Sequence, residues 1–115
     1  MLIHLDDKWF KKIENETKTI ELRLYDEKRR KFKVGDIIEF ENRLDSRKIY
    51  CEVLKLHIFK NFLELYKNLD NNKFGYDEGD LISYKDMEEF YSNLDQEKYG
   101  VVGIELKLLK TDKNI

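Results

Sequence analysis

The chain of 115 residues contains one cysteine and has no long apolar run. A single thiol, Cys51, excludes an internal disulfide, and its place in the strand-like run IYCEVLKLHIF is typical of a small buried apolar side chain. No apolar run approaches the roughly 18 residues that a membrane helix needs. The first ten residues, MLIHLDDKWF, also lack the basic and then apolar pattern of a signal peptide, so we expect a cytoplasmic protein.

Metal-binding and phosphate-loop motifs are missing as well. His4 and His57 have no cysteine or histidine at ligand spacing, and we expect each to be a strand residue with a hydrogen-bond partner. The five glycines lie in turns and in the last strand and do not cluster into a phosphate-binding loop. We therefore expect neither a metal nor a cofactor.

Charge is abundant and unevenly divided. Residues 1–60 hold 15 Lys and Arg against 12 Asp and Glu, whereas residues 61–97 hold 3 against 10. Positive charge is densest at residues 28–33, KRRKFK, which we call the basic segment. A local basic segment could bind phosphate while the acidic remainder limits indiscriminate binding, because salt screens each charge beyond about 8 to 10 Å. Both regions could equally be solvated surface.

Hydrophobic periodicity predicts a domain of short strands and helices. The predicted strands cover 2–5, 18–25, 37–42, 47–59 and 99–109, and the predicted helices cover 7–15, 61–69 and 83–94. Asp6 is the expected N-cap of the first helix, and Trp9, on the apolar face of that helix, is expected in the core. The element order favours an α+β fold, a small and mostly antiparallel β-barrel of about five to six strands capped by two to three helices. We expect one domain at 1–109 and a frayed tail at 110–115.

The predicted strand at 18–25 carries the candidate chemistry. Glu21, Arg23 and Tyr25 alternate with apolar residues, and Lys18 stands at the entrance of the strand. A desolvated lysine can act as a general base, a carboxylate can accept a proton, and the arginine fork can hold a phosphate or a base edge. Ordinary cross-strand ion pairs use the same residue types, and spacing alone leaves both interpretations open.

The stretch WFKKIENETKTIELRLYDEKRRKFKVGDIIEF resembles the ASCH domain, a small β-barrel module related to the PUA RNA-binding domains. Lys18, Glu21 and Arg23 match the family motif G-x-K-x-x-E-x-R, and the final YGVV also fits. Glu16 stands where the motif has glycine, a departure that bears on the shape of the turn between helix and strand. The resemblance implies a PUA-like barrel whose mouth forms a cavity, lined by the motif residues, for RNA or a modified nucleoside or nucleotide.

In this interpretation the basic segment borders the cavity and meets phosphates, and Tyr25 stacks on a base. The candidate binding residues are then Lys18, Glu21, Arg23, Tyr25, Arg29, Arg30, Lys31 and Lys33.

Some ASCH relatives are enzymes, which supplies the alternative interpretation. One branch removes the acetyl group of N4-acetylcytidine with a lysine, a threonine three residues later and a glutamate before the late helix, and another is linked to ribonuclease action. In an enzyme of either kind Lys18 and Glu21 would be catalytic, with Glu78 or Asp80 as a third carboxylate. Glu21 stands at the threonine position, and a carboxylate replaces a hydroxyl donor only when it is protonated. We favour the binding module. A protein partner bound through the acidic helices at 61–94 is a third alternative.

Overall fold

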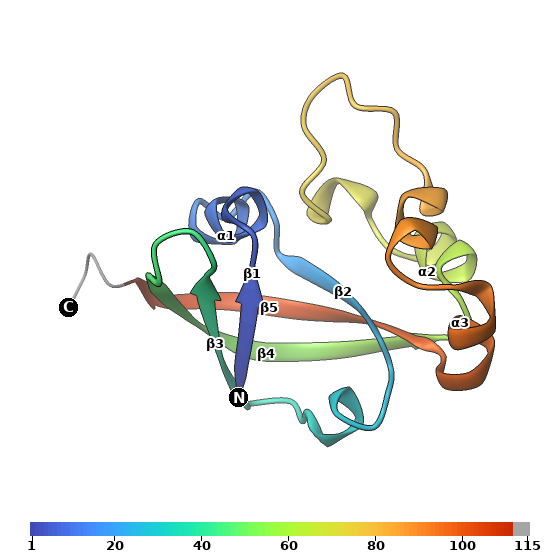
Figure 1. Ribbon diagram of the computed structural model, residues 1–115, viewed down its shortest axis with the longest axis horizontal. Helices are drawn as coiled ribbons and strands as arrows, with labels where there is room; N and C mark the ends of the chain where they lie inside the picture. The colour runs from blue at the N-terminus through green and yellow to red at the C-terminus, as the bar shows by residue number, and fades with distance from the viewer. Residues whose placement is uncertain (112–115) are drawn as a thin grey trace.

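The computed structural model describes residues 1–111, which form a five-stranded sheet and several helices (Figure 1). The strands are β1 (Leu2–Leu5), β2 (Ile20–Leu24), β3 (Ile37–Asn42), β4 (Lys48–Phe59) and β5 (Val101–Thr111). The α-helices are α1 (Asp7–Glu14), α2 (Phe62–Asn68) and α3 (Asn93–Tyr99), and the short 3-10 helices are η1 (Arg29–Lys31), η2 (Asn71–Lys73) and η3 (Tyr84–Glu89).

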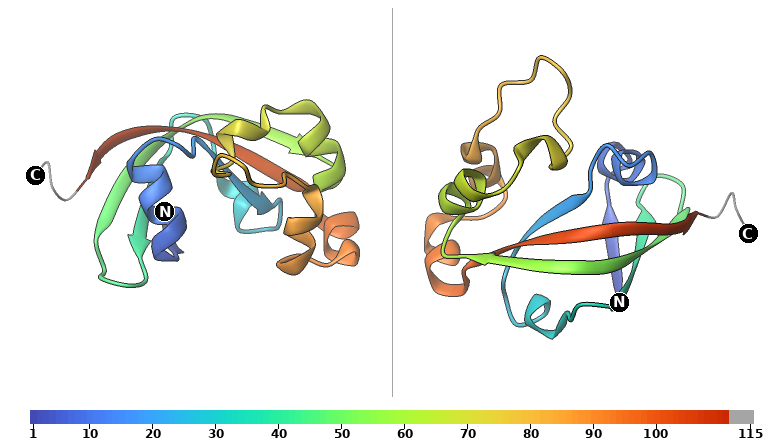
Figure 2. Two further views of the ribbon diagram at one scale, coloured as in Figure 1. Left: turned by 90° about the horizontal axis from the view of Figure 1, so that it is seen from above. Right: turned by 180° about the vertical axis from the view of Figure 1, so that it is seen from behind.

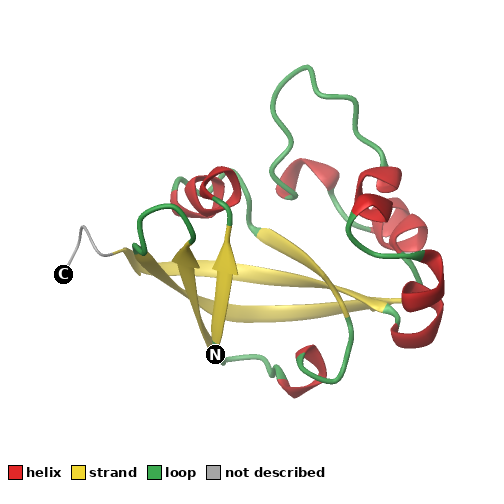
Figure 3. Ribbon diagram, in the orientation of Figure 1, coloured by secondary structure: helices red, strands yellow, loops and turns green. Residues whose placement is uncertain are grey.

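The sheet is a half-barrel with β1 at one edge and β2 at the other. Its strand order is β1-β3-β4-β5-β2, and every pairing is antiparallel except β1 with β3. The long β4–β5 ribbon has register shifts at Tyr50/Cys51 and at Val53/Lys55, which bend it into the arch seen in Figure 2. Helices α2, η3 and α3 gather at one end of this ribbon (Figure 3).

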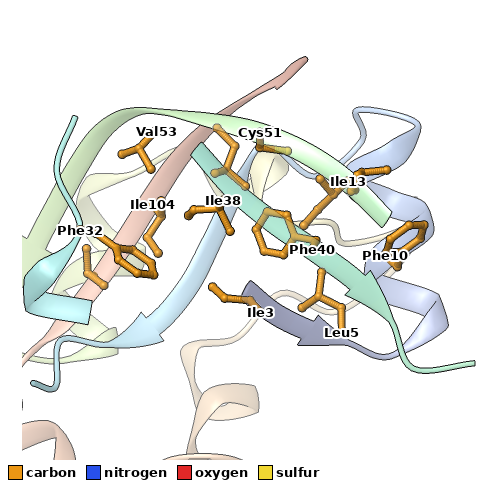
Figure 4. Packing of buried hydrophobic residues seen from close by; sticks show 13 residues of the cluster. Ile3, Leu5, Phe10, Ile13, Phe32, Ile38, Phe40, Cys51, Val53 and Ile104 are labelled. Atoms are coloured by element: carbon orange, nitrogen blue, oxygen red, sulfur yellow. The ribbon is translucent and has the colours of Figure 1, made fainter. Parts of the chain in front are cut away.

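The main core fills the inside of the arch. Phe10 and Ile13 from α1 pack there against Phe40 of β3 and Ile104 of β5, and Phe32 closes the cluster from the segment after η1 (Figure 4). The strand residues reach this core because alternate side chains of a strand point to the same face, as the burial pattern of β3 shows. The arch is thus stabilised by burial of apolar surface, at about 25 cal/mol for each Å² removed from water.

A second apolar cluster joins β2 to the helical end of the molecule. Ile20, Leu22 and Leu24 of β2 pack with Phe62 and Leu65 of α2. Since β2 is an edge strand, it pairs with only one strand of the sheet, and this cluster packs it against α2 and the chain that follows α2. The strand therefore has one neighbour in the sheet and a helical layer beside it.

The α+β, mostly antiparallel architecture expected from the sequence is confirmed. The helix expected at 83–94 is wrong in its bounds, since η3 ends at Glu89 and the separate helix α3 begins only at Asn93. Asp6 precedes α1 but its side chain makes no cap hydrogen bond, because its Oδ1 accepts from Arg43. In the expected tail, β5 continues to Thr111, and residues 112–115 lie outside the described residues. The two histidines lie in strands, with Nε2 of His4 and of His57 each 3.1 Å from a glutamate oxygen.

The turn between α1 and β2 contains a residue with positive φ. Glu16 has φ 65°, in the left-handed region that costs a side-chain-bearing residue about 1 kcal/mol relative to glycine. The chain therefore keeps the backbone conformation that the glycine of the motif would adopt, although glutamate occupies the position. The N–H of Lys18 then donates to the carbonyl of Lys12 at 3.0 Å, which ties the start of β2 to α1.

Replacing Glu16 by glycine is expected to raise the free energy of unfolding by about 0.5 to 1 kcal/mol, because it relieves the left-handed strain at this turn. Urea denaturation of both proteins measures the difference. Glu16→Ala is the matched control, since it removes the same exposed carboxylate and keeps the Cβ atom. If Glu16→Gly and Glu16→Ala change the free energy of unfolding equally, relief of backbone strain is not the cause of the change.

Candidate ligand-binding cavity

A cavity of about 770 Å³ lies where the half-barrel does not close. Both sheet edges line it, β1 through His4 and Leu5 and β2 through the stretch from Glu21 to Arg23. Helix α1 approaches from one side and the segment 74–91 from the other, as Figures 1 and 2 show. The volume lies within the range of roughly 300 to 1,000 Å³ that is usual for small-molecule sites.

Three charged side chains from β2 and its entrance converge at this cavity. The Lys18 ammonium lies 3.4 Å from Oε1 of Glu21, and Nε and Nη2 of Arg23 donate to Oε2 of Glu21 at 3.1 and 2.9 Å. Lys18 and Glu21 are each only 5% exposed. We call Lys18, Glu21 and Arg23 the charged triad. It holds one carboxylate between two cations, so it carries a net positive charge when all three are ionised.

Lys18 is fixed by the chain after α2, which runs antiparallel beside the entrance of β2. It pairs with Phe74 in an isolated β-bridge, and its Nζ donates to the Phe74 carbonyl at 2.9 Å. Gly75 follows with φ 97°, and a Cβ atom there would lie 3.2 Å from Cβ of Lys18. A glycine at 75 therefore permits both the left-handed turn and the close approach of the chain to Lys18.

Burial and mutual attraction act together on the ionisation of the triad. Burial lowers the pKa of Lys18 below its ordinary value, although the Glu21 carboxylate opposes the shift. For Glu21, burial alone would raise the pKa, but the charges of Lys18 and Arg23 outweigh it and hold the pKa below its ordinary value. Glu21 is thus an anion in the folded protein at neutral pH, and both of its oxygens face cations.

Trp9 lies in the wall of the cavity and is not part of the core, which corrects the expectation from the sequence. Its ring is partly exposed, and the ammonium groups of Lys8, Lys12 and Lys18 lie 4.9, 5.5 and 5.4 Å from the ring centroid. Phe10 and Ile13 alone of the expected apolar face of α1 are fully buried. Cations over an aromatic face are attracted to its electron density, so Trp9 joins an electropositive wall.

Tyr91 supports Arg23 from the helical end and was missed by the sequence analysis. Tyr91 lies beside Arg23, whose charge acts on the Tyr91 hydroxyl, and its ring stacks on Phe62 with centroids 5.7 Å apart. Buried Gln96 connects Tyr91 and Phe62, since its Nε2 donates to the Tyr91 carbonyl and its Oε1 accepts from the Phe62 N–H. Burial raises the pKa of Tyr91, while Arg23 opposes that shift. The hydroxyl is therefore protonated at neutral pH.

Two further tyrosines fix the wall opposite α1. The hydroxyls of Tyr66 and Tyr76 lie 2.9 Å apart, and the Tyr76 hydroxyl lies 2.8 Å from Oδ2 of Asp86. Lys12 also reaches this wall, with its Nζ donating to Asp77 at 2.8 Å and to the Gly75 carbonyl. These contacts hold the segment after Gly75 against α1 and η3.

The structure brings together only part of the candidate set. Lys18, Glu21 and Arg23 line the cavity, and so does Asp80, whereas Glu78 does not. The remaining expected residues do not line it, namely Tyr25, Arg29, Arg30, Lys31 and Lys33. Tyr25 packs against the main core with the Arg30 guanidinium 4.3 Å from its ring centroid, so it is not free to stack on a base.

Arg29 and Arg30 also have partners that hold them outside the cavity. Nη1 of Arg29 lies 3.4 Å from the Asp26 carboxylate, and Nη2 of Arg30 donates to the Tyr99 carbonyl at 2.9 Å. Lys31 and Lys33 are exposed on the same segment. None of these residues is among those that line the cavity, because β2 lies between the cavity entrance at Lys18 and this segment.

Within the described range 1–111, no helix has the length and apolar character needed to cross a membrane. Among the same residues, no three His, Cys, Asp or Glu side chains are grouped so that they could hold a metal ion.

The ASCH domain model matches residues 3–110 of the chain. The chain belongs to the ASCH domain family. The crystal structure of hypothetical protein PH0355 is similar, with 29% identity, a TM-score of 0.79, and coverage of 94% of this chain and 97% of that one. The solution structure of protein PF0455 from Pyrococcus furiosus shares 29% identity over 96% of this ASCH domain and 99% of that chain, with a TM-score of 0.70.

A more distant relative shares the fold. The crystal structure of ASCH from Zymomonas mobilis is 13% identical, with a TM-score of 0.64 over 96% of this ASCH domain and 70% of that chain. A comparison with curated proteins finds no match.

Glu21→Gln is expected to lower the free energy of unfolding by about 3 kcal/mol at neutral pH, because it leaves two buried cations without a counter-charge. The folded-state pKa of Glu21 lies below its unfolded value, so its contribution is present above the unfolded pKa and is lost as pH falls through the folded pKa. Urea denaturation from neutral pH to below about pH 4 should therefore show the two stability curves converging in acid.

Glu27→Gln is the control for this measurement, since Glu27 is exposed and its substitution should change stability by less than about 0.5 kcal/mol. Parallel curves for wild type and Glu21→Gln would contradict the assigned role of the buried carboxylate.

Proposed function

We propose that this ASCH domain binds RNA or a modified nucleoside or nucleotide, with the ligand's base in the cavity above the charged triad. The observation that carries the proposal is the charged triad itself, in which Lys18 and Glu21 are buried and which faces a cavity large enough for a nucleoside. Both Glu21 oxygens are occupied by cations, so the hydrogen-bonding capacity left for a ligand is that of donors on Lys18 and Arg23. Carbonyl oxygens and ring nitrogens of nucleobases are matching acceptors.

Aromatic and basic side chains support the same proposal. Trp9, Tyr76 and Tyr91 line the cavity, and a base stacked on an exposed aromatic ring gains about 1 to 3 kcal/mol. The basic segment 28–33 lies outside the cavity, where we propose that it meets phosphates of a longer ligand. Lys28, Lys31 and Lys33 are exposed there and are free to make such contacts.

Lys18→Met is expected to weaken ligand binding at least about tenfold, because it removes a donor from the cavity and keeps the aliphatic stem. Trp9 is the single tryptophan of the chain and lines the cavity, so its fluorescence reports occupancy. Titration with a panel of ribonucleosides, modified nucleosides and short single-stranded RNAs measures affinity. Lys67→Met, at an exposed lysine of α2, is the matched control. Equal affinity of Lys18→Met and wild type would contradict the proposed site.

A separate prediction concerns the part of the basic segment in the salt dependence of RNA binding. The variant with Lys28, Lys31 and Lys33 all changed to alanine should bind single-stranded RNA with a weaker salt dependence. The slope of log K against log salt should fall by about 0.7 for each phosphate contact that is lost. Alanine at Lys55, Lys60 and Lys67 removes the same charge from exposed positions elsewhere. If both triple variants alter the slope equally, the segment has no specific part in binding.

An enzyme acting on RNA or nucleosides is the second candidate, favoured by a buried lysine of lowered pKa beside a carboxylate in a cavity. The structure argues against acetyl removal from N4-acetylcytidine. Glu21 is ionised and held by two cations, so it cannot donate a hydrogen bond as a hydroxyl does, and the cavity-lining residues in the described range include no serine, threonine or cysteine. Incubation with N4-acetylcytidine should therefore yield no cytidine by chromatography. Turnover that Lys18→Met abolishes would establish the enzyme instead.

A further inference from the structure

The cavity has two walls of opposite charge. On the side of α1 and the strands, four cationic side chains line it against two carboxylates, which gives a net charge of +2; these are Lys8, Lys18, Arg23 and Arg43 with Asp6 and Glu21. On the side of the segment 76–91, shown across from α1 in Figure 1, only carboxylates contribute charge, namely Asp80, Asp86 and Glu89. We call these three residues the acidic wall, and its net charge is −3.

The two walls also differ in hydrogen-bonding capacity. The triad offers donors, because Glu21 has both oxygens engaged by Lys18 and Arg23. The acidic wall offers acceptors. Oδ2 of Asp86 interacts with the Tyr76 hydroxyl and Oδ2 of Asp80 accepts from the Asp77 N–H, which leaves the second oxygen of each carboxylate for other donors.

Exposed apolar side chains accompany the acidic wall. Leu81 and Phe90 line the cavity and are 90% and 65% exposed. Large apolar side chains that are this exposed beside a cavity can pack against the face of a planar ring. A phosphate at the same place would meet three like charges and two apolar groups, and it would lose its hydration without gaining a cation.

We propose that Asp80, Asp86 and Glu89 are specificity determinants that accept an N–H edge of an uncharged base and repel phosphate. A nucleotide then enters the cavity base first, with acceptor atoms toward Lys18 and Arg23 and its phosphates outside. This inference rests on the proposed function. It adds that the cavity binds the base of the ligand and that Asp80, Asp86 and Glu89 select that base.

The test compares each of adenosine, cytidine, guanosine and uridine with its own 5′-monophosphate, by Trp9 fluorescence at constant ionic strength. For the nucleosides that bind, wild-type protein should bind the monophosphate about tenfold more weakly, because a single 5′-phosphate stays at the mouth of the cavity, near the acidic wall, and only the phosphates of a longer ligand reach the basic segment. In the variant Asp80→Asn, Asp86→Asn, Glu89→Gln this ratio should shrink to within about twofold, since the amides keep the size and the acceptors but lose the charge.

A matched control removes the same charge from the same part of the chain. The variant Glu78→Gln, Glu88→Gln, Glu97→Gln changes three exposed carboxylates that do not line this cavity, and it should keep the wild-type ratio. Circular dichroism and urea denaturation of both variants show whether either has lost its fold.

Two results would overturn the inference and leave the proposed function standing. The first is a wild-type protein that binds a monophosphate as tightly as its nucleoside, and the second is an equal change of the ratio in both triple variants. Absence of binding to every nucleoside, monophosphate and short RNA would overturn the proposed function, and the inference with it.

Discussion

The ion pairs of Glu21 with Lys18 and Arg23 are the interaction on which the site depends. Removing a carboxylate and an ammonium from water costs several kcal/mol for each ion, and their attraction offsets that cost only when the geometry is close and the remaining hydrogen bonds are satisfied. The Phe74 carbonyl accepts from Lys18, and Tyr91 lies beside Arg23. The triad therefore requires the chain that pairs with Lys18 at Phe74 as well as β2 itself, and segments far apart in the sequence must fold together to make it.

The half-barrel explains why such a costly arrangement faces a cavity. A closed barrel would pair β1 with β2 and fill the space between them with side chains. Here β1 pairs with β3 and β2 with β5 in the described residues, and the space between the two edges is lined by α1 and the segment 74–91. The long β4–β5 ribbon lies between the two edge strands, β1 and β2, and supports both sides of the sheet (Figure 2). Polar side chains of an edge strand are thus held by a well-packed sheet.

The sequence predicted the parts of the molecule that local pattern controls. Alternation of apolar residues located the strands, and the spacing of Lys18, Glu21 and Arg23 identified the triad. Of the acidic wall only Asp80 was a candidate from the sequence. Asp86, Glu89 and Tyr91 were not predicted, because their positions depend on a long connection whose path is set by tertiary contacts such as Lys12 with Asp77. Trp9 was misplaced since its spacing with Phe10 and Ile13 is also that of a core residue. The basic segment was expected at the cavity because it is close in sequence, yet Arg30 is held by the Tyr99 carbonyl beyond the end of β2.

The separation of the basic segment from the triad constrains how the proposed ligand could lie. Tyr91 lines the cavity, and burial raises its pKa, while the charge of Arg23 and that of Arg29, at the start of the basic segment, oppose the rise. A longer ligand with its base above the triad would meet the basic segment with its further phosphates, because Lys28, Lys31 and Lys33 are exposed there. In this arrangement β2 and its entrance would contact the base, and the basic segment that follows β2 would contact the phosphates.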